Sequence, residues 1–297
     1  MFEGLMVAMV TPFRDGALDL EATARLIETM LEGGVEGLVV SGSTGEAATC
    51  SLDERRALWA FVHERARGRV PVVAGTGTNN TAESITNTRI AEELGLDGAM
   101  LVTPYYNRPG VRGQVEHFAT VAKSTRLPII LYNVPSRTAT NSMPEVFEKL
   151  AGVPNIVAVK EASGSLDQAG AIAARTKLTL LSGDDSLTLP IIAVGGQGVI
   201  SVAGNVAPRE MRALCDHARA GRNAEAIAAH QRMQPLLKAL FIESNPAPAK
   251  YLLSAMGICA NELRLPLVTV EPANEQLILG AASALGLALE PAAGARR

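Results

Sequence analysis

One lysine of the sequence stands where a reactive amine could be made. Lys160 directly follows Ile-Val-Ala-Val and so closes an apolar run that is typical of a buried strand. If its side chain points inward, desolvation lowers its pKa from about 10.4 toward the value of about 7 to 8 that suits nucleophilic attack. A neutral amine there can condense with a ketone to a Schiff base. The alternative is a lysine that points to solvent or pairs with Glu161, and the strand position alone leaves both open.

Hydroxyl groups and an arginine follow other apolar runs. Tyr132 closes the preceding run, so its phenol would stand beside Lys160 and could exchange protons during imine formation, or simply pack at the rim. Ser43 and Thr44 lie in SGSTGE, whose glycines suit a tight turn that brings backbone N–H groups to a carboxylate. Arg137 lies on a loop beyond Tyr132 and could bind a carboxylate in bidentate fashion, although a loop arginine can also be merely solvated.

Metal and phosphate chemistry find little support in the sequence. The Asp184-Asp185 pair is interpreted as a helix N-cap. The glycines at 75–77 and 195–198 form neither a Walker nor a dinucleotide motif. The histidines have no metal-ligand spacing and stand at His63, His117, His217 and His230. We therefore expect catalysis without a metal and without a cofactor.

The elements that must position these residues are eight short apolar runs. They are rich in Val, Ile and Leu without polar alternation, as in parallel strands buried on both faces. In chain order, from Leu5 to Asn205, they are LMVAMVTPF, EGLVVSGST, VPVVAGTG, GAMLVTPYY, LPIILYNVP, NIVAVKEAS, LTLLSGDD and QGVISVAGN. Alternation with helices predicts an α/β fold, the closed (β/α)8 TIM barrel, whose catalytic groups lie at the carboxyl ends of strands. An open doubly wound sheet would usually have fewer strands and a glycine-rich phosphate turn.

Helix signals divide the chain into two parts. Capping and periodic residues predict helices that begin near Leu20, Leu52, Thr81, Arg112, Pro144, Leu166, Ser186 and Pro208. We expect a catalytic barrel over 1–220 and a helical extension over 221–297, packed on the barrel as one unit, with helices at 223–241, 247–256 and 275–285. The final EPAAGARR has too little apolar surface to order itself and is expected to fray.

Composition excludes several classes of partner. The 297 residues are 47% hydrophobic and 19% charged, which fits one barrel of about 250 residues plus an extension. The 27 basic and 30 acidic residues are interspersed, so we expect neither nucleic acid nor an anionic membrane as partner. No apolar run reaches the roughly 18 residues of a membrane span. The odd set Cys50, Cys215 and Cys259 argues against disulfides and favours a reducing cytoplasm.

Seven motifs in order resemble the dihydrodipicolinate synthase family, which belongs to the pyruvate-dependent Schiff-base aldolases and lyases. They are SGSTGE (41–46), TPYYNRP (103–109), LYNVPSRT (131–138), VKEASG (159–164), LLSGDD (180–185), GVISVAGNVAP (198–208) and NPAPAK (245–250). The resemblance runs from about residue 2 to 285. It implies a cytoplasmic enzyme of diaminopimelate and lysine biosynthesis that condenses pyruvate with L-aspartate 4-semialdehyde, assembled as a homotetramer of two dimers.

The resemblance also implies the catalytic residues. Lys160 matches the Schiff-base lysine, and Tyr132 matches the tyrosine that transfers protons. Ser43 and Tyr106 match the rest of a hydroxyl relay, with Tyr106 expected to reach in from a neighbouring subunit. The family commonly has threonine where this chain has Ser43, and serine keeps the hydroxyl.

Four more residues match positions that hold substrate. The resemblance implies that Thr44 and Ile200 hold pyruvate, Ile200 through its backbone, while Gly183 lines the same pocket. Arg137 matches the residue that receives the carboxylate of the semialdehyde.

Control by lysine is one point on which the chain departs from the family that it resembles. Inhibited members often carry histidines where this chain has Leu52 and Arg55, beside the retained Asn79, Glu83 and Tyr105. A cation at Arg55 would oppose a cationic effector.

Two alternative functions stay open at this point. An aldolase for N-acetylneuraminate or another sugar acid would share the lysine and the tyrosine, but Arg137 and NPAPAK favour the synthase. A barrel that binds a keto acid without turnover would have no need of the hydroxyl set.

Overall fold

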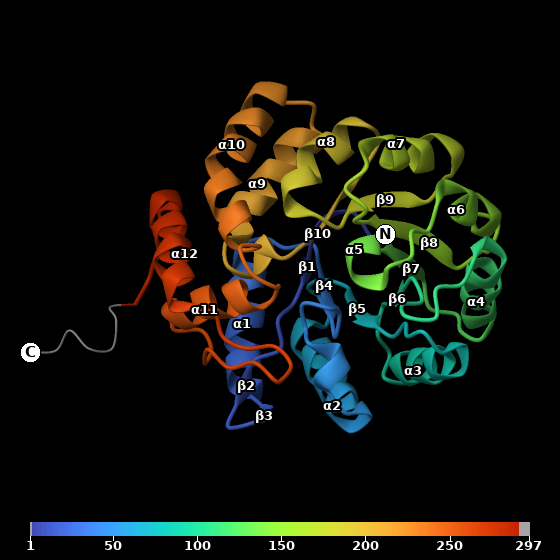
Figure 1. Ribbon diagram of the computed structural model, residues 1–297, viewed down its shortest axis with the longest axis horizontal. Coiled ribbons are helices and arrows are strands. Elements are labelled where there is room, and N and C mark those ends of the chain that lie inside the picture. Colours follow the sequence, from blue (N-terminus) through green and yellow to red (C-terminus); the bar gives the residue numbers. More distant parts are fainter. Residues whose placement is uncertain (1, 291–297) are drawn as a thin grey trace, which may run out of the picture.

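The computed structural model describes residues 2–290, and within them eight parallel strands close into a barrel (Figure 1). The strands are β1 (Gly4–Ala8), β4 (Gly37–Val40), β5 (Val72–Gly75), β6 (Gly98–Val102), β7 (Ile129–Asn133), β8 (Ile156–Glu161), β9 (Thr179–Ser182) and β10 (Gly198–Ser201). Each pairs in parallel with the next along the chain, and β10 closes on β1. The predicted TIM barrel is confirmed.

Helices connect the strands and cover the outside of the barrel (Figure 1). They are α1 (Leu20–Glu32), α2 (Leu52–Ala66), α3 (Thr81–Glu93), α4 (Val111–Lys123), α5 (Pro135–Thr138), α6 (Pro144–Leu150), α7 (Leu166–Arg175), α8 (Thr188–Ala193) and α9 (Pro208–Arg219). The predicted start near Ser186 is two residues early, because Asp185–Leu187 forms a separate 3-10 turn. The short α5 and a hairpin of β2 (Phe13–Arg14) and β3 (Ala17–Leu18) were not predicted, since two to four residues show no periodicity.

Alternate residues of each strand feed two separate apolar layers. One layer fills the barrel interior and includes Met6, Val39, Tyr132, Ala158 and Ile200. The other lies between the strands and the surrounding helices. Because successive strand residues point to opposite faces, a residue two positions after Ala158 also faces the interior. This periodicity places Lys160 inside the barrel.

Helices alone follow α9 within the part of the chain that the structure describes. They are α10 (Asn223–Ala239), α11 (Ala247–Ala255) and α12 (Pro272–Leu285), close to the predicted ranges. α10 packs against α9 and α12, at the left of Figure 1. The division at residue 220 that we propose falls in the turn between α9 and α10. Of the EPAAGARR segment, residues 291–297 lie outside the described residues.

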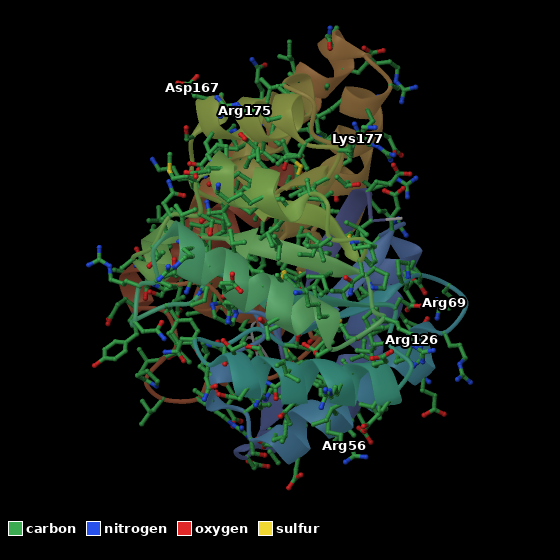
Figure 2. All side chains as sticks on the ribbon, turned by 90° about the vertical axis from the view of Figure 1, so that its right-hand side faces the viewer. Arg56, Arg69, Arg126, Asp167, Arg175 and Lys177 are labelled. Atoms are coloured by element: carbon green, nitrogen blue, oxygen red, sulfur yellow. The ribbon has the colours of Figure 1, made fainter. Side chains whose placement is uncertain are left out.

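Charged side chains lie on the outer surface of the helices. Figure 2 shows Arg126 and Arg175 pointing outward. Arg126, in the loop after α4, pairs at 3.1 Å with Glu92 of α3. Arg175, the last residue of α7, pairs at 3.1 Å with Glu148 of α6. Among the described helices, none is long and apolar enough to cross a bilayer.

Candidate active site

Two neighbouring strands bring the predicted amine and phenol into contact. Tyr132 of β7 pairs in register with Lys160 of β8. The Nζ of Lys160 lies 4.2 Å from the centroid of the Tyr132 ring, and Lys160 is only 5% exposed. Glu161 points to the other face and accepts hydrogen bonds from Asn133 and Gln168. The alternative in which Lys160 points to solvent or pairs with Glu161 is therefore wrong.

Burial changes the acidity of both groups. It lowers the pKa of Lys160 to about 8, an effect that the Asp185 carboxylate opposes and the Arg137 charge strengthens. Burial raises the pKa of Tyr132 to about 12, while the Arg137 charge and the Ser43 hydroxyl act to lower it. Near neutral pH an appreciable fraction of the amine is therefore uncharged, and the phenol keeps its proton.

The lowered pKa of Lys160 predicts a pH profile for attack on a ketone. Below about pH 8 the amine is mostly protonated, so the initial rate at low pyruvate should rise about tenfold per pH unit and level off above the pKa. The pKa of Tyr132 lies well above this range, so its ionisation should not limit the rate there. Initial rates of pyruvate adduct formation, measured across this range, test the profile. A rise centred on the ordinary lysine pKa of about 10.4 would contradict it.

A second buried lysine differs from Lys160 in having a partner. Lys250 is fully buried, and its Nζ lies 2.6 Å from the carboxylate of Glu46 and donates to the carbonyl of Glu262. It also lies 4.3 Å from the centroid of the Phe13 ring. Within residues 2–290, the Nζ of Lys160 makes neither an ion pair nor a hydrogen bond with a side chain or carbonyl. Lys160 is therefore the buried amine available for chemistry.

A cavity of about 590 Å³ opens at the carboxyl ends of the strands. Ser43, Tyr132 and Arg137 line it. Lys160 is not a lining residue and lies one side chain deeper, against the ring of Tyr132. The cavity thus joins two of the predicted hydroxyls, those of Ser43 and Tyr132, and the predicted carboxylate-binding arginine in one space. No cluster of three His, Cys, Asp or Glu side chains in the described chain is arranged to hold a metal ion.

The SGSTGE segment forms the tight turn that its glycines predicted. The N–H of Gly45 donates to the carbonyl of Gly42, and Glu46 adopts a left-handed conformation with φ +51°. This turn leaves Ser43 exposed at the cavity and buries Thr44. Both predicted hydroxyls of this turn are therefore at the barrel mouth, and they face different surroundings.

Gly183 lies against Lys160, and Ile200 lies buried in the same interior layer as Tyr132. Gly183 donates its N–H to the carbonyl of Glu161. A Cβ added to Gly183 would lie 3.1 Å from Cγ and Cε of Lys160 and 2.6 Å from Cβ of Ala162. A larger residue at position 183 would force the side chain of Lys160 to move.

Replacement of Gly183 with alanine should therefore slow formation of the pyruvate adduct by at least about tenfold. Even a small displacement moves the amine out of line with the ketone carbon that it must attack. Quenched-flow trapping of the adduct measures the rate. Gly152→Ala is the matched control, since an added Cβ there meets no heavy atom within 4 Å. Equal rates in the two variants would contradict this role of Gly183.

Sequence reasoning missed two positioning residues. The Asp184-Asp185 pair was predicted to be an N-cap, which holds for Asp184, whose carboxylate accepts the N–H of Ser186. Asp185 is different: it is buried and accepts hydrogen bonds from the Ser201 hydroxyl and the N–H of Val202. It therefore anchors the turn after β10, next to Ile200. Its local pattern looks like a cap, so no signal in the sequence distinguished it.

Asn245 is the second missed residue. It opens the NPAPAK motif, which supported the resemblance but was given no role. Its Nδ2 donates to Thr44 Oγ1 at 2.9 Å, and its carbonyl accepts from a guanidinium nitrogen of Arg137 at 3.2 Å. Two predicted substrate-binding residues thus meet at one residue of the link between α10 and α11.

Tyr106 is the one predicted site residue that this chain does not bring to the others. It is 90% exposed, has φ +67° and does not line the cavity, whereas the adjacent Tyr105 does. The Tyr105-Tyr106 pair lies on the exposed loop between β6 and α4.

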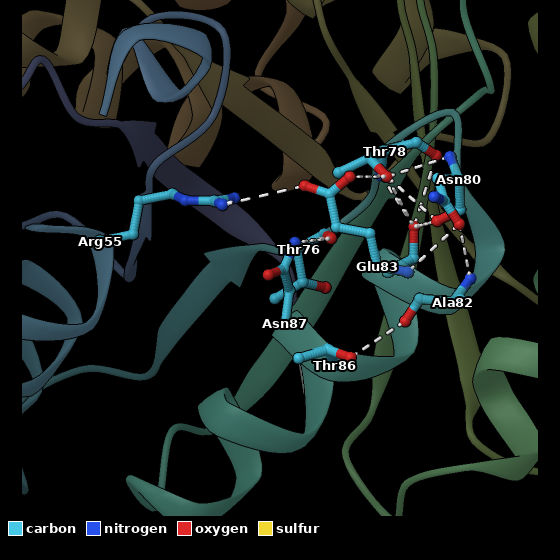
Figure 3. A network of polar contacts seen from close by, with 9 residues as sticks. Arg55, Thr76, Thr78, Asn80, Ala82, Glu83, Thr86 and Asn87 are labelled. Atoms are coloured by element: carbon cyan, nitrogen blue, oxygen red, sulfur yellow. Dashed lines mark hydrogen bonds and ion pairs between the residues drawn. The ribbon is translucent and has the colours of Figure 1, made fainter. Parts of the chain in front are cut away.

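Arg55 and Glu83 also line the cavity. Figure 3 shows their side chains facing each other. A guanidinium nitrogen of Arg55 lies 4.0 Å from the Glu83 carboxylate. The same carboxylate accepts from the Thr78 hydroxyl at 3.4 Å. A cationic effector at this part of the cavity would meet a guanidinium already paired with the nearest acid.

Comparison with known proteins agrees with this geometry. The model of the "Dihydrodipicolinate synthetase family" matches residues 1–284. A 4-hydroxy-tetrahydrodipicolinate synthase of Citrifermentans bemidjiense is 49% identical over 92% of this chain and 95% of its own length. The crystal structure of dihydrodipicolinate synthase from Aquifex aeolicus is 43% identical, has a TM-score of 0.96 and is matched over 98% of this chain and 100% of that one.

A second solved structure bears on assembly. It is described as a monomeric dihydrodipicolinate synthase variant, is 41% identical, has a TM-score of 0.95 and is matched over 97% of this chain and 98% of that one. The names of these relatives support the synthase reading and not the sugar-acid alternative. The chain belongs to the dihydrodipicolinate synthetase family.

Proposed function

We propose that this enzyme condenses pyruvate with L-aspartate 4-semialdehyde through a Schiff base on Lys160. The observation that carries the proposal is a buried amine without an ion-pair partner in the described chain, held 4.2 Å from the ring of Tyr132 with its pKa lowered to about 8. The activity is that of a 4-hydroxy-tetrahydrodipicolinate synthase, a lyase-type enzyme of diaminopimelate and lysine biosynthesis.

The reaction begins with attack of neutral Lys160 on the ketone carbon of pyruvate. The carbinolamine oxygen leaves as water, with Tyr132 delivering and recovering protons, and a protonated imine remains. Loss of a methyl proton turns this imine into an enamine, because the iminium nitrogen accepts the electron pair. The enamine carbon then bonds to the aldehyde carbon, whose oxygen becomes a hydroxyl. Finally the amine of the second substrate displaces Lys160 and closes a six-membered ring.

The other site residues have binding and relay roles in this proposal. Ser43 and Tyr106 extend the proton path from Tyr132. Thr44 and the backbone of Ile200 hold pyruvate, and Gly183 leaves room beside the amine. Arg137 receives the carboxylate of the semialdehyde with its planar fork of N–H donors.

The exposure of Tyr106 supports a subunit contact. A large aromatic ring that is 90% exposed on a loop with left-handed backbone is typical of a residue that another chain covers. We therefore propose that Tyr106 completes the site of a neighbouring subunit in a homotetramer of two dimers. Sedimentation velocity tests the assembly, and a monomer that keeps full activity would contradict it.

The cytoplasm is the compartment that we propose. Cys50, Cys215 and Cys259 are all buried and unpaired, as suits a reducing environment.

Mass spectrometry after borohydride reduction tests the nucleophile and the first substrate together. With pyruvate present, one reduced adduct per chain is expected on the peptide that contains Lys160. A parallel assay compares aspartate semialdehyde plus pyruvate with cleavage of N-acetylneuraminate. Turnover of the first pair alone supports the proposal, whereas turnover of N-acetylneuraminate alone, or an adduct on another lysine, contradicts it.

A further inference from the structure

Asn245 lies between two residues that the proposed function assigns to the two substrates. Its side-chain amide donates to the hydroxyl of Thr44, and its backbone carbonyl accepts from Arg137. Asn245 is 4% exposed, yet it lines the cavity at the barrel mouth. It reaches this place from the link between α10 and α11, and the Lys250–Glu46 ion pair ties α11, which directly follows this link, to the SGSTGE turn.

The direction of the bond to Thr44 has a chemical consequence. A threonine hydroxyl has one hydrogen to donate and two lone pairs that accept. Within the described residues, the bond from Asn245 is the only side-chain hydrogen bond of Thr44 Oγ1, and Thr44 is the acceptor. The hydroxyl hydrogen therefore remains available for an acceptor in the site. A carboxylate is an acceptor only.

We propose that Asn245 is a positioning residue that turns the hydroxyl of Thr44 into a hydrogen-bond donor for the carboxylate of pyruvate. This inference rests on the proposed function and adds a residue to it. By engaging a lone pair of Thr44, the amide directs the hydroxyl hydrogen away from itself and toward the ligand. Thr44 and Asn245 therefore act together: Thr44 contacts the substrate, and Asn245 fixes the Thr44 hydroxyl as a donor.

The opposite orientation of the amide would have the opposite effect. In the structure, Asn245 Oδ1 is buried and has no hydrogen-bond partner among residues 2–290. If the amide were turned around, Oδ1 would face Thr44 and take its hydrogen, and the pyruvate carboxylate would meet lone pairs. The two orientations therefore predict different responses to Asn245→Asp, which offers only acceptor oxygens to Thr44.

Steady-state kinetics on the full chain separate the two substrates. Asn245→Ala should raise the KM for pyruvate about tenfold, the size of effect expected for one lost polar bond in a buried site. The KM for the semialdehyde should stay within about twofold, because Arg137 bonds to the backbone carbonyl, which the substitution keeps. Asn245→Asp, which has nearly the shape of asparagine, should raise the pyruvate KM at least as much.

A double-mutant cycle with Thr44→Val isolates the proposed route. The Thr44→Val variant lacks the hydroxyl that Asn245 would orient. Adding Asn245→Ala to it should therefore change the pyruvate KM by less than about twofold. An unchanged pyruvate KM in Asn245→Asp would overturn the inference. So would an equal rise of both KM values, or the same tenfold effect of Asn245→Ala with and without the Thr44 hydroxyl.

Borohydride trapping in the unaltered enzyme distinguishes the failure of this inference from that of the proposed function. If no pyruvate adduct forms on Lys160, the proposed function fails. If the adduct forms and the Asn245 variants behave like the unaltered enzyme, only the role of Asn245 is overturned.

Discussion

Replacement of Lys160 with alanine is expected to abolish the reducible pyruvate adduct and to lower kcat/KM by at least about 10⁴-fold. In the proposed mechanism the amine is the nucleophile and the iminium formed on its nitrogen is the electron sink, so loss of the amine removes the covalent route and not merely a contact. The substitution should leave β8 folded, because this strand is held by backbone pairing with β7 and β9. Intact-mass measurement after borohydride reduction, together with the coupled assay, reads both effects.

Lys177→Ala provides the matched control for this variant. Figure 2 labels Lys177, an exposed lysine. It precedes β9 and so lies at the amino ends of the strands, whereas the cavity opens at their carboxyl ends. Its replacement should leave adduct and rate unchanged within about twofold. A stoichiometric adduct in Lys160→Ala, or its loss in Lys177→Ala, would contradict the assignment of the nucleophile.

Replacement of Lys250 with methionine is expected to lower the free energy of unfolding by about 3 to 5 kcal/mol. Lys250 and Glu46 are both fully buried, 2.6 Å apart. Without the ammonium, Glu46 keeps only the N–H of Arg264 as a hydrogen-bond donor in the described chain. The carboxylate would then be a buried charge without a counter-charge in contact, which is far more costly than an absent pair. Denaturant unfolding followed by circular dichroism measures the change.

Two further variants separate this effect from loss of an ordinary ion pair. Lys149→Met breaks the exposed pair with Glu145, 3.2 Å apart, and should cost less than about 0.5 kcal/mol. Adding Glu46→Gln to Lys250→Met removes the stranded charge and should recover part of the lost stability. A Lys250→Met variant no less stable than Lys149→Met would show that the buried pair does not hold the SGSTGE turn to the C-terminal segment.

The elements were predictable because their signals are local. The run NIVAVKEAS is apolar without alternation, so it predicted a strand buried on both faces, and β8 occupies Ile156–Glu161 within it. The adjacency of Lys160 and Tyr132 in neighbouring strands also follows from local information, because consecutive parallel strands pair and both residues end their runs. The roles of these residues in the reaction remain proposals.

Contacts between distant parts of the chain were not predictable in the same way. Asp185 looks like a cap beside Asp184, yet it holds the turn after β10. Lys250 and Glu46 are 204 residues apart in sequence, and each alone has the appearance of an ordinary surface charge. Only the return of the chain after α10 brings them together and removes them from water.

The amino-acid sequence by itself determined the eight strands and the hydroxyls at the strand ends, because apolar runs and side-chain alternation act within a few residues. The strand position of Lys160 left its orientation open, and the structure places it inside the barrel. The tertiary structure decided which lysine stays unpaired, what Asp185 holds and where Asn245 touches Thr44 and Arg137. These depend on the burial and mutual distance of groups that the chain separates widely, and no local pattern encodes the electrostatic environment that results.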